Sequence, residues 1–212
     1  MRAVLLLLAL CACAKTEKGS HQLDVNKIEV VDNARLRTDT VGDKQFASTS
    51  TFVLVDAKNP TAEGAYVTLA GDLTGDAGKV VGHLKAQSIW IPPGETRTFA
   101  LIDTERVPRP ETTSARIVVT GALVTPDPPR VHVSDLALYQ DNGRTVAQAN
   151  VINDADRIGK VIVIAAFHDD KNRPMTRPFQ VLEIDKHQTT PVQFVGPDHS
   201  TQGTIFVGDV IY

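Results

Sequence analysis

The chain has 212 residues, a formal net charge of -3, and 42% hydrophobic and 22% charged residues. This mildly acidic balance, without a basic stripe anywhere along the sequence, excludes the electrostatic footprint of a nucleic-acid-binding protein. The apolar fraction is typical of a folded globular protein, and the length suffices for two domains of about 100 residues, each with its own core.

The first residues have the character of a signal peptide. Arg2 supplies a short positive start, and the apolar run over residues 4–10 is far too short to span a bilayer. Both cysteines of the chain lie at the end of this run. The sequence Leu10-Cys11-Ala12-Cys13 resembles the lipobox of bacterial lipoproteins, which implies a signal peptide over residues 1–12 and acylation of Cys13.

Two alternatives remain for this N-terminus. Acylation of Cys11 would place bulky Leu10 at the cleavage position, and an ordinary secretory signal also fits, because Ala12-Cys13-Ala14 satisfies the small-x-small rule. The short signal and the cysteine at its end favour the lipoprotein, and an alanine after that cysteine resembles the outer-membrane lipoproteins of Gram-negative bacteria. We therefore expect acyl chains on Cys13 to anchor the protein in the outer membrane, facing the periplasm, through a polar tether over residues 13–24.

From residue 25 onwards the sequence predicts short strands separated by turns. Apolar residues alternate with polar ones, as at Val53 and Val55, while no window shows the apolar period of a helix. Proline, glycine and asparagine mark the turns, and Asn142-Gly143 predicts a tight hairpin. This pattern predicts an all-β fold of antiparallel sandwiches. It divides the chain into a first domain over 25–124, a proline-rich linker over 125–129 and a second domain over 130–212.

The two predicted domains repeat one pattern. Residues 27–124 align with residues 130–212 in four blocks, whose offset falls from 103 to 94, 93 and 88. Matching apolar positions are Val30 with Val133, Val67 with Val161, Phe99 with Val192, and Val119 with Val207. The offset changes only between strands, which is typical of an internal duplication with longer loops in one copy. We therefore expect two tandem domains of the same fold.

Several turn and strand residues resemble those of two known families. In the first repeat they are Asn59-Pro60, Val67-Thr-Leu69, Gly75-Asp-Ala-Gly78 and Ile91-Pro-Pro-Gly-Glu, and the second repeat keeps Asn153 and Phe167-His-Asp-Asp170. The second repeat departs from the pattern where Lys186-His187-Gln188 replaces the Pro-Gly-Glu turn. Both repeats are similar to bacterial FxLYD-type modules and to the water-stress domains of late-embryogenesis-abundant proteins. The resemblance implies two tandem immunoglobulin-like antiparallel β-sandwich domains, from families without a common catalytic site.

The sequence offers no pattern of a catalytic or cofactor site. It contains neither a Gly-x-Ser-x-Gly nucleophile elbow nor a phosphate-binding loop, and no cysteine follows Cys13. We therefore predict that the protein is not an enzyme and holds no cofactor. The second repeat contains four histidines, namely His132, His168, His187 and His199. No two of them have the spacing of a metal motif, so we expect no metal site and interpret His168 as a solvated loop residue.

Three apolar side chains are candidates for contacts with a protein partner. Trp90 points out of its strand, and it either contacts a partner or packs under the proline turn that follows it. Ile162 and Ile164 lie on an outward face that the first repeat keeps polar. Something is expected to cover this face: an extra strand or loop of the same domain, the first domain, or a partner protein.

These features predict a non-enzymatic lipoprotein of the cell envelope, a binding or assembly module that presents its sandwich surfaces to a protein partner. The alternative is a periplasmic carrier of a small ligand or metal that uses the histidines of the second repeat.

Overall fold

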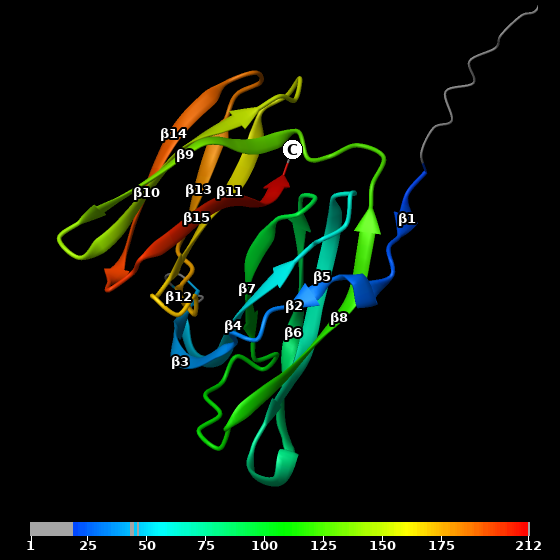
Figure 1. Ribbon diagram of the computed structural model, residues 1–212, viewed down its shortest axis with the longest axis vertical. Coiled ribbons are helices and arrows are strands. Elements are labelled where there is room, and N and C mark those ends of the chain that lie inside the picture. Colours follow the sequence, from blue (N-terminus) through cyan, green and yellow to red (C-terminus); the bar gives the residue numbers. More distant parts are fainter. Residues whose placement is uncertain (1–18, 43–44, 46, 212) are drawn as a thin grey trace, which may run out of the picture.

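The structure is a computed structural model that describes residues 19–42, 45 and 47–211 (Figure 1). Within these ranges the chain is all-β, as predicted, with fifteen strands in antiparallel sheets and short 3₁₀ turns such as η1 (Val25–Lys27) and η3 (Asp76–Gly78). No helix in the described ranges is long and apolar enough to cross a membrane. The predicted signal peptide and Cys13 lie outside the described residues.

The N-terminal half, residues 19–124, consists of two antiparallel sheets that pack face to face (Figure 1). The first sheet has the order β1-β8-β5-β6, from β1 (His21–Gln22), β8 (Ser114–Val124), β5 (Ala65–Thr74) and β6 (Val80–Ile91). The second sheet is centred on β4 (Ser48–Lys58), which pairs with β2 (Glu29–Val30), β3 (Arg35–Val41) and β7 (Thr96–Ile102). Alternate apolar residues of these strands fill the space between the sheets.

The C-terminal half, residues 131–211, also has two antiparallel sheets around a core of its own. One has the order β14-β10-β9, from β14 (Thr189–Asp198), β10 (Arg144–Asn153) and β9 (Val131–Asp141). The other is centred on β11 (Gly159–His168), which pairs with β12 (Pro174–Thr176), β13 (Phe179–Ile184) and β15 (Gln202–Ile211). No strand lies between Val124 and Val131, where the sequence predicts the linker.

The two halves share one strand order and one register. β8-β5-β6 corresponds to β15-β11-β13, and β7-β4-β2 corresponds to β14-β10-β9. Val67 pairs with Ala122 in the N-terminal half, and the residues at the sequence offsets of 94 and 88, Val161 and Val210, pair in the C-terminal half. The offsets taken from the sequence therefore relate equivalent pairs of residues in space, as an internal duplication requires.

A buried asparagine fixes the same loop in each half. Asn59 Nδ2 donates a hydrogen bond to the carbonyl oxygen of Ile91 (3.0 Å), and its counterpart Asn153 Nδ2 donates to that of Ile184 (3.0 Å). Each amide also donates to the carbonyl oxygen four residues further along the chain. Both asparagines are fully buried, so each one satisfies loop carbonyls that would otherwise lack a donor.

Two turns show how the backbone follows the sequence. Asn142 and Gly143 have φ values of 49° and 78°, which is the conformation of the tight hairpin predicted for this pair. Gly94 has a φ of 75° in the Pro-Pro-Gly-Glu turn of the first repeat, and its counterpart His187 has a φ of 56°. The second repeat therefore keeps the left-handed turn although it lacks the glycine that adopts it at least cost.

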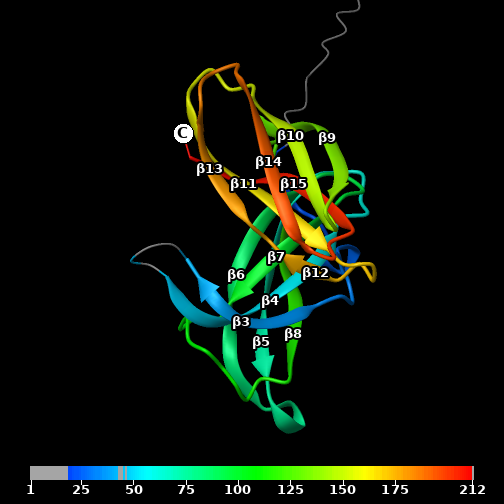
Figure 2. The same cartoon turned by 90° about the vertical axis from the view of Figure 1, so that its left-hand side faces the viewer.

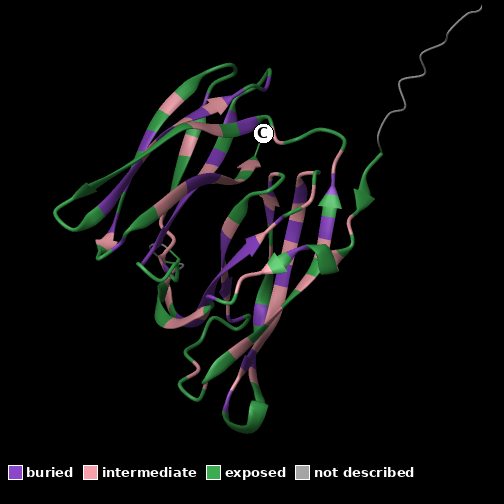
Figure 3. Cartoon of the chain, in the orientation of Figure 1, coloured by how far each residue is buried: buried purple, intermediate pink, exposed green. Residues whose placement is uncertain are grey.

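The outer face of β11 packs against the N-terminal half, where buried residues continue from one half into the other (Figure 3). Ile164 and Ala166 are 4% and 0% exposed, and with Phe206 of β15 they belong to the cluster of buried side chains that fills the first sandwich. Ile162 packs against the same cluster. Of the covers considered for this face, the structure therefore places the N-terminal half there.

The segment expected as a tether belongs partly to the fold. His21 and Gln22 pair with β8, and Leu23 packs against the core of the N-terminal half. The expected tether over residues 13–24 is therefore wrong at its C-terminal end. The polar character of His21 and Gln22 concealed a strand, because a strand at the edge of a sheet does not need an apolar face.

We predict that Ile164→Glu separates the two halves and lowers the free energy of unfolding by more than about 3 kcal/mol, because it buries an unpaired charge. Urea unfolding measures the loss, and proteolysis within residues 125–129 reports the separation. Ala70→Glu is the matched control, since Ala70 is the counterpart at the offset of 94 and is half-exposed, so its cost should stay below about 1 kcal/mol. Equal losses in both variants would contradict the shared core.

Candidate functional site

A buried polar cluster joins the two halves where the end of β11 meets β4. His168 Nε2 lies 2.9 Å from Asp56 Oδ2, and these two side chains are 9% and 3% exposed. Asn33 donates to the same carboxylate oxygen (2.7 Å), and the Thr98 hydroxyl donates to Oδ1. The interpretation of His168 as a solvated loop residue is therefore wrong, because the N-terminal half covers the end of β11.

The surroundings of Asp56 favour its charged form. Burial by itself raises the pKa of this carboxyl group, but the hydrogen bond and charge of His168, with hydrogen bonds from Thr98 and Asn33, outweigh burial and hold the pKa below its ordinary value of 3.8. Removal of one partner would leave the others buried without compensation. The cluster therefore ties the end of β11 to one place on β4.

Arginine side chains extend the junction beyond this cluster. Arg37 Nη1 donates to a backbone carbonyl oxygen of β12 (2.6 Å), and β12 lies against β4 (Figure 2). Arg177 Nε donates to the carbonyl oxygen of Thr98 (2.8 Å). The guanidinium groups of Arg97 and Arg177 lie 5.2 and 5.7 Å from the centre of the Phe206 ring, within the range of cation–π attraction. Burial lowers the pKa of Arg177 to about 10, so this side chain stays charged at neutral pH.

Beside this junction, the two halves leave an open cleft of about 1230 Å³. The C-terminal half contributes three continuous stretches to its wall, residues 131–136, 154–157 and 204–210. The linker closes one end, where it passes over the C-terminal end of β15 (Figure 1). The wall on the N-terminal half consists of Tyr66, Trp90, Pro92, Glu95 and Arg97. The volume exceeds that of an ordinary small-molecule pocket, so the cleft has room for a segment of polypeptide.

Trp90 forms an aromatic wall of the cleft together with Tyr66. The two residues are paired across β5 and β6, and their rings pack edge to face with centroids 5.2 Å apart. Gly64 lies against the indole, where the Cβ atom of any other residue would collide with it. Trp90 is half-buried and lines both the cleft and a smaller pocket of about 280 Å³ beside Pro93. The structure therefore places Trp90 next to the proline turn and, at the same time, on the cleft.

Carboxylates outnumber guanidinium groups around the cleft. The acidic residues that line it are Glu95, Asp127, Asp135, Asp154, Asp156 and Asp209, and the arginines are Arg97, Arg130 and Arg157. Some of these groups are already paired, as Arg97 is with Glu95 (2.6 Å) and Asp154 is with His132 (3.4 Å). The excess of carboxylates favours a ligand that carries positive groups.

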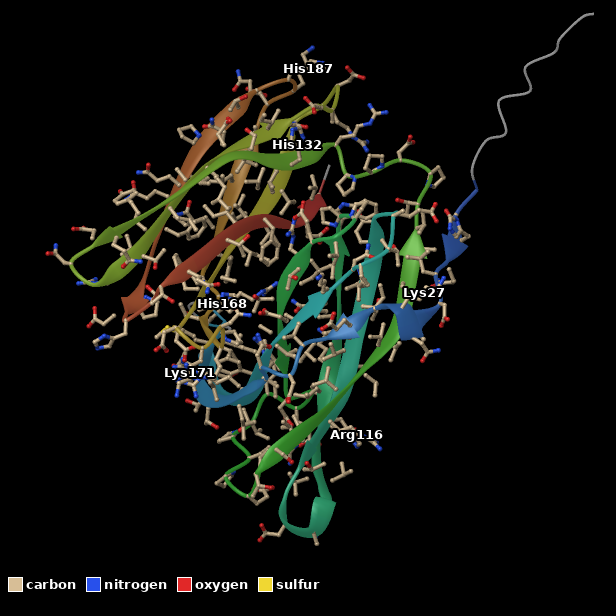
Figure 4. The ribbon with its side chains drawn as sticks, viewed as in Figure 1. Lys27, Arg116, His132, His168, Lys171 and His187 are labelled. Atoms are coloured by element: carbon tan, nitrogen blue, oxygen red, sulfur yellow. The ribbon has the colours of Figure 1, made fainter. Side chains whose placement is uncertain are left out.

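The histidines considered as metal ligands lie apart. His168 lies at the junction of the halves, whereas His132 lines the cleft near the linker and His187 lies at the far end of the C-terminal half (Figure 4). His187 Nε2 is 3.0 Å from Asp156 Oδ1, an exposed pair. In the part of the chain that the structure describes, no three His, Cys, Asp or Glu side chains are placed to share a metal ion.

Reasoning from the sequence found Trp90 but not the rest of the cleft. Ile162 and Ile164, grouped with Trp90 as partner contacts, lie under the junction and do not line the cleft. Tyr66 and Arg97 were missed, because the register of β5 and β6 that places Tyr66 opposite Trp90 is known only from the structure. Nothing in the sequence indicated that β9 and β15 would lie opposite these residues, on the other wall of the cleft.

Comparisons with known proteins give no family for this chain. No family model matches it, and no curated protein matches it. Among solved structures, a crystal structure of red sea bream transglutaminase is similar over 84% of this chain, with 12% sequence identity and a TM-score of 0.26. The match covers 29% of that chain, and a likeness of this size carries no inference about activity.

We predict that Asp56→Asn lowers the free energy of unfolding at pH 7 by about 3 kcal/mol, because it removes a buried carboxylate that bonds to His168, Asn33 and Thr98. The folded-state pKa of Asp56 lies below the unfolded value, so its contribution is complete above pH 3.8 and is lost as pH falls through the folded pKa. The difference between the two proteins should therefore shrink below pH 3.8. Urea unfolding at a series of pH values measures this difference.

Asp72→Asn provides the control for this experiment. Asp72 also lies 2.9 Å from a histidine, His83, but the side chain of that histidine is 75% exposed, so water screens the pair. The control should lose much less stability at pH 7. Equal effects of the two substitutions would show that burial adds nothing to the pair of Asp56 and His168.

Proposed function

We propose that the protein is a non-enzymatic binding module of the bacterial cell envelope, built from two tandem immunoglobulin-like sandwiches and anchored in the outer membrane through Cys13. Its function is to hold a protein partner in the cleft between the halves. The observation that carries this proposal is the open cleft with Trp90 and Tyr66 on one wall and consecutive backbone of β15 on the other. Aromatic side chains that line a concavity are typical anchors of protein contacts.

The fixed junction supports a binding role. Asp56, His168 and Thr98 bond to one another and are buried where the halves meet, so they stabilise the junction and are not exposed to a ligand. Because the halves share buried side chains, the cleft keeps its shape without a ligand. A partner that binds a preformed cleft pays little for rearrangement of the protein.

The position of the cleft suits a partner at the same membrane. Residues 14–20 span at most about 25 Å when extended, so an anchor on Cys13 would hold β1 close to the membrane surface. Gly19 and His21 line the smaller pocket together with Trp90, next to the cleft. The cleft is therefore expected on the side of the protein that faces the membrane.

A periplasmic carrier of a metal or small ligand is the alternative, and it would use His132 and His187 with Asp154 and Asp156 at the rim. Each of these histidines has one carboxylate beside it, which is fewer ligands than a structural zinc site requires. A rise in melting temperature with micromolar divalent metal would favour the carrier, since a ligand of the folded state stabilises it by mass action.

We predict that Cys13→Ser abolishes fatty-acid labelling in cells and moves the protein from the membrane fraction to the soluble fraction. Cys11→Ser is the matched control and should leave both properties unchanged. Labelling that persists in Cys13→Ser would contradict the anchor. A native protein that carries no fatty acid and is found in the soluble fraction would identify an ordinary secretory signal.

We predict that a photo-crosslinking phenylalanine analogue at Trp90 forms a discrete adduct with one envelope protein in living cells. The same analogue at Tyr139 is the control, because Tyr139 is an aromatic residue that is 45% exposed and does not line the cleft. The adduct should form at position 90 and not at position 139. The same adduct at both positions, or none at position 90, contradicts a binding role of the cleft.

A further inference from the structure

In the N-terminal half, the free edge of β8 is covered by the segment that precedes the first sandwich. β1 pairs antiparallel with β8, and the Leu23 N–H donates to the carbonyl oxygen of Ala122 (2.8 Å). The Ala122 N–H in turn donates to the side-chain oxygen of Gln22 (3.1 Å). The chain then turns through η1, and Ile28 enters the core at 5% exposure. A short extended segment therefore closes this side of the first sandwich.

The C-terminal half lacks this cover. The counterpart of Ile28 is Val131, but the residues before Val131 form the linker, which comes from β8 of the other half and does not pair with β15. In the described part of the chain, β15 pairs through backbone hydrogen bonds with β11 alone, and β9 lies near it without pairing. Ala122 is 0% exposed, whereas its counterpart Val210 is half-exposed and the adjacent Ile211 is 60% exposed. The strand edge at Val210 is therefore equivalent to the edge of β8 at Ala122, but no strand of the described residues pairs with it.

The uncovered edge is the edge that borders the cleft. Every residue from Thr204 to Val210 lines the cleft, and successive residues of a strand share one side only at its backbone edge. The Val210 N–H, whose counterpart bonds to β1 in the N-terminal half, is held by the carboxylate of Asp209 (2.8 Å). An edge that offers backbone donors and acceptors is a template for an added strand.

We propose that the cleft binds an extended segment of the partner protein, which adds as an antiparallel strand to β15 and alternates apolar and basic residues. This inference rests on the proposed binding role of the cleft. Its apolar residues would pack where Leu23 packs in the N-terminal half, against the partly buried Val207 and Val210. Its basic residues face the excess carboxylates of the cleft, and a basic side chain can also lie over the aromatic pair of Tyr66 and Trp90.

Three capped seven-residue peptides test the proposal with the full chain in detergent. The first alternates lysine and valine, the second alternates glutamate and valine, and the third has proline in place of the central valine of the first. Trp90 is the one tryptophan of the chain and lines the cleft, so its fluorescence reports binding, with calorimetry as a second measurement. The first peptide should bind at least about tenfold more tightly than the other two, because charge and backbone donors are both required.

Val210→Pro removes the outward N–H of β15, and Val210→Ala keeps it while removing side-chain bulk. The proline variant should bind the lysine-valine peptide about tenfold more weakly, and the alanine variant should stay within about threefold of the native protein. Asp209→Lys changes an exposed residue and should also weaken binding about tenfold, which keeps the test decisive if the proline variant does not fold.

Equal binding of all three peptides, or native binding by both Val210→Pro and Asp209→Lys, would overturn strand addition. Failure of every peptide to bind, while the analogue at Trp90 still captures its partner in cells, would also overturn strand addition but leave the binding role intact. Absence of both peptide binding and the adduct at position 90 would remove the proposed function itself.

Discussion

The outer face of β11 is the constraint on which the rest of the structure depends. This strand is apolar on both faces, so one sandwich cannot bury it, and Ile164 and Ala166 need a second apolar surface. Each large side chain covered in this way contributes about 1.5–3 kcal/mol, enough to hold two sandwiches together once a few are buried. The N-terminal half supplies that surface and thereby fixes the relative position of the halves. The cleft is the part of the space between them that this contact leaves open.

The polar cluster fixes the relative position of the two halves more than it stabilises them. A buried carboxylate and its polar partners gain little over apolar side chains of the same size, because burial removes their water. Yet the Asp56 carboxylate can bond to His168 of the other half, and to Asn33 and Thr98 of its own half, in only one arrangement of the two halves. The apolar layer alone would tolerate sliding of one sheet on the other. We infer that the cluster selects one arrangement and so keeps Trp90 opposite the edge of β15.

The sequence predicted what depends on local pattern and on repetition. Alternation placed Val67 and Val161 in the cores, and the offsets of the two repeats agree with the strand registers. It failed where a residue's partner comes from the other half. His168 follows a strand and precedes two aspartates, which is the pattern of a solvated turn, and only the packing of the halves buries it. The cleft is likewise defined by stretches that are far apart in the sequence, so no local pattern contained it.

The two halves differ on the surfaces that meet at the junction. The junction is heterologous, with the β4 face of one half against the β11 face of the other, and such contacts between identical units form either closed rings or open filaments. Each half presents only one of the two surfaces. At the offset of 94, Asp56 corresponds to Asn150 and Ile164 corresponds to Ala70, so the second copy has no acceptor face and the first has no apolar docking face. Within the described residues, β15 also lacks the segment that covers β8, so the same difference between the halves leaves the backbone edge beside the cleft without a paired strand.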